Sequence, residues 1–260
     1  MYTLVGGNTM QDDKRQVPDV RGVLTQLRDG DRAVKEYAAD VLAGIGEQAV
    51  PGLIHALKDP DIDVQEFACT ALVHIGTPAV PLLVRSLQED DEEFVGLVGG
   101  VLAEIGDEAV DVLVHALSSG IPSLQLSAGA TLIVMGVPAV PSLTGCLIHE
   151  DEDVRSLARA VLMEIGGPAA TALIDTYRSA CEGLKLPIQD VFVEIGQDAV
   201  RPLIAAMIEG DPLVRKCAAD VLVSMGGQSY PLLREIAQEG TGPEQTCAMY
   251  ALSLFPVPIE

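Results

Sequence analysis

The sequence predicts an all-α fold, a right-handed superhelical solenoid of about seven helical hairpins of 30 residues with a half-repeat at each end. Glycine recurs at a strict interval of 30 residues, and a leucine follows each glycine by seven residues, with no insertion in the array. The chain holds five Tyr, four Phe and no Trp in 260 residues, which suits narrow slots between stacked helices. The repeated glycines are Gly46, Gly76, Gly106, Gly136, Gly166, Gly196 and Gly226.

The first helix of a repeat is clearest in the second unit. Its apolar residues stand at separations of four, three, one and three, which places them on one stripe of a helix. They are Val64, Ala68, Ala71, Leu72 and Ile75. Gly76 ends this helix, because glycine adopts the left-handed conformation without a Cβ clash.

The second helix of the unit follows at once. We expect Thr77 to cap it and Pro78 to occupy its first position, where no intrahelical hydrogen bond is lost. Because one hairpin cannot bury two apolar faces alone, neighbouring hairpins must stack. A column of small residues would let adjacent first helices approach closely: Ala38, Ala68, Ala128, Ala158, Ala218 and Ala248.

Three motifs in the same unit carry a family resemblance. They are D-P-D-x-D-V at 59–64, A-L-x-x-I-G at 71–76 and P-A-V-P-x-L at 78–83. The chain resembles the short HEAT-like repeats named after phycobilisome lyase subunits, an armadillo-like α-solenoid family, over roughly residues 18–255. The resemblance implies a scaffold, an adaptor or a lyase subunit, since fold alone does not fix function.

The chain divides into residues 1–17, an N-terminal tail or cap, and residues 18–260, a single solenoid. The sixth repeat departs from the pattern, because Pro187 falls where other first helices are in mid-turn. Proline removes a donor and clashes with the preceding turn, so we expect this helix to start near Pro187 and to be short. We expect residues 244–255 to form one last helix.

The net charge of −22 and a pI near 4.3 argue against binding to nucleic acid or to an anionic membrane surface. Residues 112–148 contain no Asp, Glu, Lys or Arg and exceed the length of a membrane span, yet prolines, serines and the repeat register favour a place in the solenoid. Five cysteines without C-x-x-C spacing and an N-terminus unlike a secretory signal predict a cytoplasmic protein.

Chemistry-bearing motifs are scarce. The related deoxyhypusine hydroxylases hold a di-iron centre through several His-Glu pairs, whereas here only His149-Glu150 matches. His55 and His115 stand two repeats apart, roughly 20 Å at an interhelical step of 8–10 Å, which is too far for one metal ion. The run 59–63 imitates a calcium loop but lacks its glycine and its final glutamate, so we interpret it as acid placed before a helix. We therefore predict no catalytic residue, no metal, no cofactor and no enzymatic activity.

The surface of the second helices is the leading candidate for a binding site. By analogy with HEAT-like folds it should line the concave side, and its N-terminal half carries basic or titratable residues: Arg21, Arg28, His55, Lys58, Arg85 and His115. In an acidic molecule such a patch suits an acidic partner segment. The alternative is that Arg28 and Lys58 only complement helix C-termini.

A second candidate surface is the uncharged centre of the chain. First-helix positions that carry charge in other repeats become Gly96, Gly100, Leu126 and Ala130, and Leu97 lies beside them as a further member of the candidate interface. An apolar surface of this kind marks a partner or self-association site, unless these helices are packed more deeply or covered by the N-terminal tail.

The leading functional hypothesis is a non-catalytic scaffold or adaptor that binds a segment of another protein on its concave surface. Two alternatives remain open. One is a lyase-type or deoxyhypusine-hydroxylase-like enzyme subunit, as the resemblance permits. The other is a structural protein that forms a homo-oligomer through its uncharged central repeats.

Overall fold

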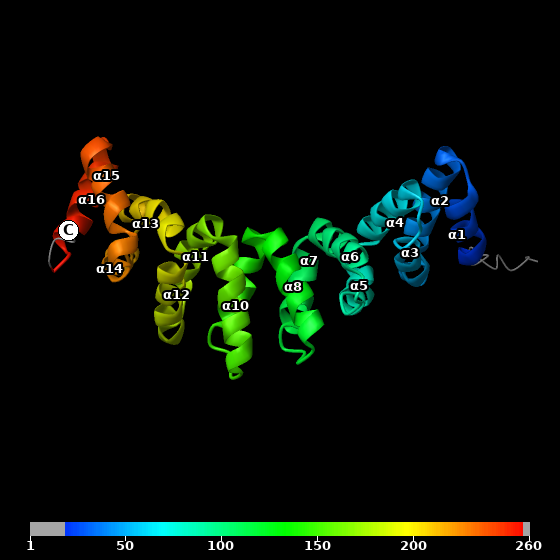
Figure 1. Ribbon diagram of the computed structural model, residues 1–260, viewed down its shortest axis with the longest axis horizontal. Helices are drawn as coiled ribbons and strands as arrows, with labels where there is room; N and C mark the ends of the chain where they lie inside the picture. The colour runs from blue at the N-terminus through cyan, green and yellow to red at the C-terminus, as the bar shows by residue number, and fades with distance from the viewer. Residues whose placement is uncertain (1–18, 257–260) are drawn as a thin grey trace, which may run out of the picture.

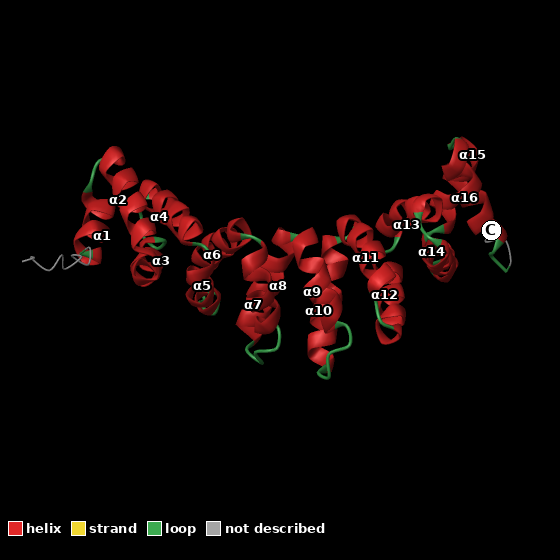
Figure 2. Cartoon of the chain, turned by 180° about the vertical axis from the view of Figure 1, so that it is seen from behind, coloured by secondary structure: helices red, strands yellow, loops and turns green. Residues whose placement is uncertain are grey.

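The computed structural model describes residues 19–256, and this part of the chain contains helices and no strand (Figures 1 and 2). The helices follow one another along an elongated arc, with the blue N-terminal and red C-terminal ends far apart. Each hairpin packs mainly on the hairpins before and after it. The all-α solenoid predicted from the 30-residue repeat is confirmed, with seven hairpins and a half-repeat at each end.

The first helices of the hairpins begin after the inter-repeat loops. They are α2 (Arg32–Ile45), α4 (Ile62–Ile75), α6 (Glu92–Ile105), α8 (Pro122–Met135), α10 (Glu152–Ile165), α12 (Glu182–Ile195) and α14 (Pro212–Ser224). The second helices are α3 (Val50–Ala56), α5 (Val80–Ser86), α7 (Asp107–Ala116), α9 (Val140–Cys146), α11 (Gly167–Ser179), α13 (Gln197–Glu209) and α15 (Tyr230–Glu239). The half-repeats are α1 (Val20–Asp29) and α16 (Gly242–Ser253).

The repeated glycines make the corner inside each hairpin. All seven have positive φ, from 55° at Gly226 to 85° at Gly106, so a side chain there would be strained. In the second, fourth and fifth hairpins the chain direction changes by 109°, 117° and 119° across this corner. The glycine column of the sequence therefore sets the angle between the two helices of a unit.

Four hairpins insert a short 3₁₀ turn after this corner: η1 (Gly46–Ala49), η2 (Thr77–Ala79), η3 (Val137–Ala139) and η4 (Gly226–Gln228). The expectation that Thr77 caps the second helix is wrong, because its side chain makes no capping hydrogen bond. Instead the Gly76 carbonyl accepts a 2.8 Å bond from the N–H of Ala79. The backbone turn thus supplies the partner that a cap would have supplied.

The core is a continuous aliphatic strip between the two helix layers. The leucine that follows each corner glycine is at most 1% exposed in every repeat. The column of small residues predicted for close approach is equally buried. Its alanines have no exposed surface except Ala218, which is 1% exposed: Ala38, Ala68, Ala128, Ala158, Ala218 and Ala248. Because helix spacing follows side-chain size at the contact, these alanines explain how a core almost without aromatic rings is filled.

The sixth hairpin corrects a prediction. Helix α12 starts at Glu182 rather than near Pro187, and the proline lies inside the helix. A proline at this depth removes one hydrogen bond to Gly183, the residue four positions earlier. The burial of Ile188, Val191 and Phe192 against the neighbouring repeats offsets that loss, because packing supplies most of the stability of a helix in a protein.

The acidic inter-repeat loops owe much of their composition to helix capping. An aspartate stands at the N-cap of five first helices and accepts a hydrogen bond from a backbone N–H of the first turn: Asp31, Asp61, Asp91, Asp151 and Asp211. This geometry confirms that the calcium-like run 59–63 is acid placed before a helix. The carboxylates satisfy N–H groups that have no intrahelical partner.

A polar column that the sequence analysis missed ties each loop to the following helix. At the fourth or equivalent position of a first helix, a side-chain N–H donates to a backbone carbonyl of the preceding loop or helix end. The donors are Gln65, Gln125, Arg155, Arg215 and Gln245. In the sequence this column is visible only as a long polar side chain at multiples of 30 residues. Because it is glutamine in some repeats and arginine in others, the residue type alone does not reveal a shared role.

A candidate peptide groove at the N-terminal end

A groove of about 300 Å³ opens between α1, α3 and the loop before α4. It brings together four of the six predicted binding residues: Arg21, Arg28, His55 and Lys58. Thr25, Asp59 and Pro60 join them at the edge, and apolar side chains including Leu24, Leu27 and Val64 form the floor. An apolar floor with charged groups at its rim suits an extended peptide rather than a rigid small molecule.

Helix α1 supplies one wall of the groove, because its groove residues share one face of the helix. Arg21, Thr25 and Arg28 stand four and three residues apart, so they share one face of the helix. On the opposite wall, Gly52 lies against Leu24 so closely that a Cβ would fall 2.3 Å from its Cδ1 atom. The missing side chain at Gly52 therefore lets Leu24 pack against α3 and shapes the floor.

The basic residues of the groove differ in how strongly neighbouring carboxylates engage them. Lys58 pairs with Glu89 of the next loop and places its Nζ atom 4.3 Å from the centre of the Phe94 ring. Arg28 lies 3.6 Å from Asp59 while its own side chain is 71% exposed. Arg21 has no carboxylate partner among residues 19–256. Arg21 and Arg28 are accordingly the groove cations best placed to meet a ligand.

The remaining two predicted residues lie elsewhere. Arg85 lines a separate hollow of about 350 Å³ between α3 and α5, beside Pro51 and Leu82. His115 is exposed on α7 and lines neither hollow. A third hollow of about 330 Å³ lies between α11 and α13. Hollows between successive second helices thus recur along the solenoid, and the predicted column crosses several of them rather than forming one site.

A larger cleft, of about 710 Å³, lies between α14 and α16 and was not predicted from the sequence. Helix α16 packs on α13 and α15, and this leaves space over α14 that is lined by Met207, Tyr250 and Leu254. Arg215 and Lys216 stand at its margin, although Arg215 already donates to the Gly210 carbonyl. In the sequence, the only feature that points to this cleft is that the last repeat consists of a single helix.

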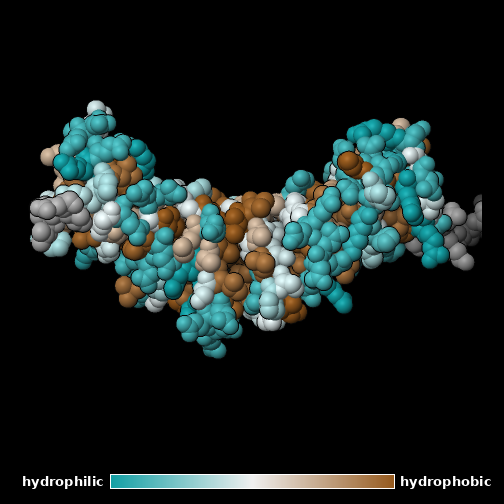
Figure 3. Space-filling view, in the orientation of Figure 1, coloured by the Kyte–Doolittle hydropathy of each residue, from teal (hydrophilic) through white to brown (hydrophobic). Residues whose placement is uncertain are grey.

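The uncharged central surface has the exposure that the sequence predicted for most of its members. Gly96, Gly100, Leu126 and Ala130 are exposed, whereas Leu97 is half-buried. Leu126 is 74% exposed, and Val134, which the sequence analysis did not name, is 72% exposed. Figure 3 shows this hydrophobic surface as brown atoms over the centre of the molecule.

The described residues contain no cluster of three or more His, Cys, Asp or Glu side chains arranged to hold a metal ion. His149 belongs to a loop, where its Nδ1 atom accepts a hydrogen bond from the N–H of Asp151. Burial raises the pKa of the Cys69 thiol to about 11 and also raises the pKa values of Cys146 and Cys217. These thiols are protonated at neutral pH and are weak nucleophiles.

No single helix in residues 19–256 is long and apolar enough to cross a membrane, although three bent helix pairs meet the length and composition requirement together.

Comparison with known proteins supports the repeat assignment. Residues 20–99 match the family model described as HEAT repeats. No curated protein matches the sequence. The match is to HEAT repeats in general, so the finer resemblance to phycobilisome lyase-type repeats stays a prediction.

Three solved structures are similar over most of the chain. Human deoxyhypusine hydroxylase in complex with glycerol is 18% identical, with 92% of this chain and 96% of that chain covered and a TM-score of 0.33. An engineered protein is 20% identical, with 90% and 95% covered and a TM-score of 0.29. An archaeal HEAT-like repeats protein from Thermococcus onnurineus NA1 is 13% identical, with 78% and 95% covered and a TM-score of 0.31.

The assignment itself rests on the family match and on the repeated geometry. The hairpin seen in residues 20–99 continues, with the same glycine corner and buried leucine, to the end of the described chain. The protein is therefore an all-α solenoid of 30-residue helical hairpins, and its residues 20–99 match HEAT repeats.

Proposed function

We propose that this protein is a non-catalytic scaffold that binds an acidic segment of a partner protein in the groove between α1 and α3. HEAT repeats generally mediate protein–protein interactions, which supports the class of function. The observation that carries the location is the convergence of Arg21, Arg28, His55 and Lys58 on one groove in a chain of net charge −22.

Electrostatics favours an acidic ligand at this place. A chain of net charge −22 repels an acidic peptide over most of its surface. A local group of cations focuses the encounter on one end of the solenoid and raises the association rate. Lys58 is engaged by Glu89, whereas Arg21 has no carboxylate partner among residues 19–256 and Arg28 keeps a 71% exposed side chain beside Asp59, so the specificity is expected to come from the two arginines.

The ligand is expected to be extended and partly apolar. Its carboxylates would meet the two arginines, while an apolar side chain between them would contact the half-buried Leu24 and Ala56 on the floor. Arginine suits this role because its planar guanidinium binds a carboxylate through two parallel hydrogen bonds. Ligand charges alone would give weak, strongly salt-dependent binding, and the apolar contact supplies the remaining affinity.

The test is a selection from a random peptide display library on the full-length protein. Peptides recovered by the wild type should be enriched in Asp and Glu over the starting library. A variant carrying Arg21→Glu and Arg28→Glu should lose these peptides, whereas Arg201→Glu with Arg234→Glu should retain them. The control arginines are exposed, lie on α13 and α15, and have no carboxylate partner among the described residues.

Equal recovery of the same peptides by both double variants would reject the groove. The groove variant is expected to fold, because the Arg28 side chain is 71% exposed and an ion pair made by an exposed side chain contributes at most about 1 kcal/mol. Circular dichroism of both variants provides the control for helical content.

A further inference from the structure

We propose that the outward face of α6, α8 and α10 is a homodimer interface on which a second copy of this chain packs. This inference is independent of the peptide groove, which lies at the N-terminal end of the solenoid. It starts from an unusual helix: α8 contains no charged side chain from Pro122 to Met135. Its exposed face nevertheless carries Leu126 and Val134, which are 74% and 72% exposed.

The three helices form one continuous surface. Helix α8 packs beside α6 on one side and beside α10 on the other. The exposed positions next to Leu126 are Gly96 on α6 and Ser156 on α10, and those next to Ala130 are Gly100 and Ala160. The surface therefore has a central apolar ridge flanked by two strips of small residues, and Figure 3 shows its hydrophobic centre.

The shape of this surface is complementary to the same surface on a second copy. The exposed sides of Gly96 and Gly100 are open, since a Cβ at either position meets no atom within 4 Å. Ala130 lies midway between Leu126 and Val134, so two α8 helices that cross in antiparallel orientation at Ala130 set Leu126 of one copy beside Val134 of the other. Each ridge then rests on the small-residue strip of the opposite copy, as ridges pack into grooves between helices.

Charge selects this face among the surfaces available to a second copy. Two molecules of net charge −22 repel each other, and the repulsion is smallest where the acidic residues are absent. The acids return at the margin, where Glu104 and Glu164 flank Val134 on the neighbouring helices. A different partner would be free to bring basic residues to that margin, whereas a second copy brings more acid, so salt dependence distinguishes the two.

The size of the face suits a weak dimer. A helix of 14 residues is about 21 Å long, and three helices at 8–10 Å spacing make a face of roughly 570 Å². Stable complexes bury about 800 Å² on each partner, so the contact falls somewhat below that value. We therefore expect association in the upper micromolar range.

The test is sedimentation equilibrium of the full-length protein up to about 500 μM, at about 50 mM and about 500 mM NaCl. A dimer should form, and its dissociation constant should fall at least threefold at the higher salt concentration because salt screens the repulsion between the acidic margins. Leu126→Asn with Val134→Asn should weaken the dimer at least tenfold, since each substitution acts twice in a symmetric interface.

Tyr37→Asn is the matched control. Tyr37 is 67% exposed and lies on α2, outside the proposed face, so its substitution should leave the dimer unchanged. A monomer at every concentration and salt condition would overturn the proposal. So would a dimer that the two asparagine substitutions do not weaken, or one that salt weakens, because ion pairs rather than this uncharged face would then hold the copies together.

Discussion

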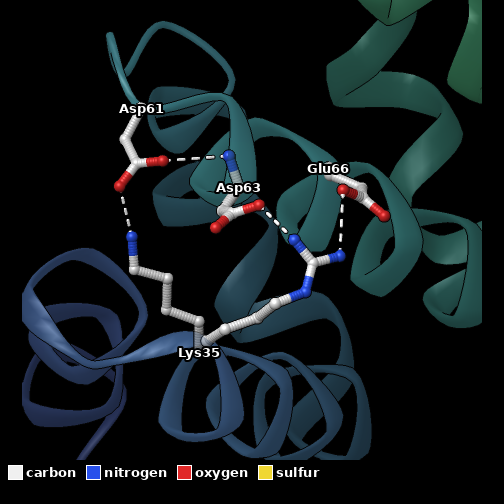
Figure 4. Close-up of polar contacts among 5 residues, drawn as sticks. Lys35, Asp61, Asp63 and Glu66 are labelled. Carbon is white, nitrogen blue, oxygen red and sulfur yellow. Dashed lines mark hydrogen bonds and ion pairs between the residues drawn. The ribbon is translucent and has the colours of Figure 1, made fainter.

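Lys35 of α2 crosses the boundary between two repeats and forms an ion pair with Asp61, the N-cap residue of α4 (Figure 4). The Lys35 side chain is only 7% exposed, whereas that of Asp61 is 47% exposed. In Figure 4 the two side chains point toward each other from neighbouring repeats, with Asp63 and Glu66 beside them. Arg32 pairs with both of these acids, so two cations of one repeat hold three carboxylates of the next.

Because Lys35 is buried, we expect substitutions of the two members of this ion pair, Lys35 and Asp61, to change stability by different amounts. Asp61→Asn retains a capping side chain but leaves the Lys35 ammonium buried without a counter-charge, which is costly. Lys35→Met removes the buried charge and replaces it with an apolar chain of similar length. The urea midpoint of unfolding should therefore fall more for Asp61→Asn than for Lys35→Met. The reverse order would show that Lys35 is solvated in the folded protein.

The same pair predicts a contribution to acid sensitivity. The hydrogen bond from Lys35 holds the pKa of Asp61 below its ordinary value of 3.8. Since the folded pKa is depressed, this stabilisation is present above the ordinary value and is lost as pH falls through the folded pKa. Unfolding free energy measured between about pH 5 and about pH 2 should thus decrease less steeply in Lys35→Met than in the wild type.

Asp211 provides the internal reference for that experiment. Its pKa is also lowered, mainly by the backbone N–H of Val214, and it lies before α14, toward the other end of the solenoid from Lys35. Its contribution should persist in Lys35→Met, so part of the acid dependence must remain. Identical pH profiles for the two proteins would contradict the assignment of the shift to Lys35.

Cys181 occupies the N-cap of α12 without a capping bond, although its φ of −67° and ψ of 160° resemble those of the capping residue Asp211. Cys181→Asp should therefore add a cap and stabilise the sixth repeat by about 0.5–1 kcal/mol, which urea denaturation can measure. Cys181→Ala is the control for loss of the thiol. Equal stability of the two variants would show that the first turn of α12 does not accept a cap.

Pro187 predicts a second gain in the same helix. Pro187→Ala should restore the N–H donor that faces the carbonyl of Gly183 and raise stability by about 1–3 kcal/mol, because interior proline is the least favourable residue in a helix. Hydrogen exchange should also slow in the first two turns of α12. A destabilised variant would indicate that the half-buried proline ring makes packing contacts worth more than the missing bond.

The repeat made the fold predictable. Corner glycines and buried leucines are local requirements that recur every 30 residues, so each unit can be located without knowing its neighbours. The start of α12 was not predictable in this way, since propensity at Pro187 opposed packing by Phe192 and the packing prevailed. Propensity is a weak guide wherever a helix lies between two others.

The candidate groove was predictable only in part. The 30-residue spacing placed His55, Arg85 and His115 in one column, with Arg21, Arg28 and Lys58 added at its basic end. Which of these residues share one hollow depends on the spacing between helices. The pairing of Lys58 with Glu89 involves residues 31 positions apart whose side-chain directions the sequence does not specify. Val134 meets the same criterion as Leu126, because its column carries glutamate in both neighbouring repeats, so the sequence already contained the signal for it.

The binding role of the N-terminal groove is tested most directly by calorimetric titration of an acidic peptide obtained from the display selection into the full-length protein. Wild type and the Arg201→Glu, Arg234→Glu control should bind alike, and affinity should fall as salt is raised. Arg21→Glu with Arg28→Glu should weaken binding at least a hundredfold, about 2.7 kcal/mol, because two charge-assisted contacts are replaced by repulsion. Undiminished affinity in that variant would contradict the role of the groove.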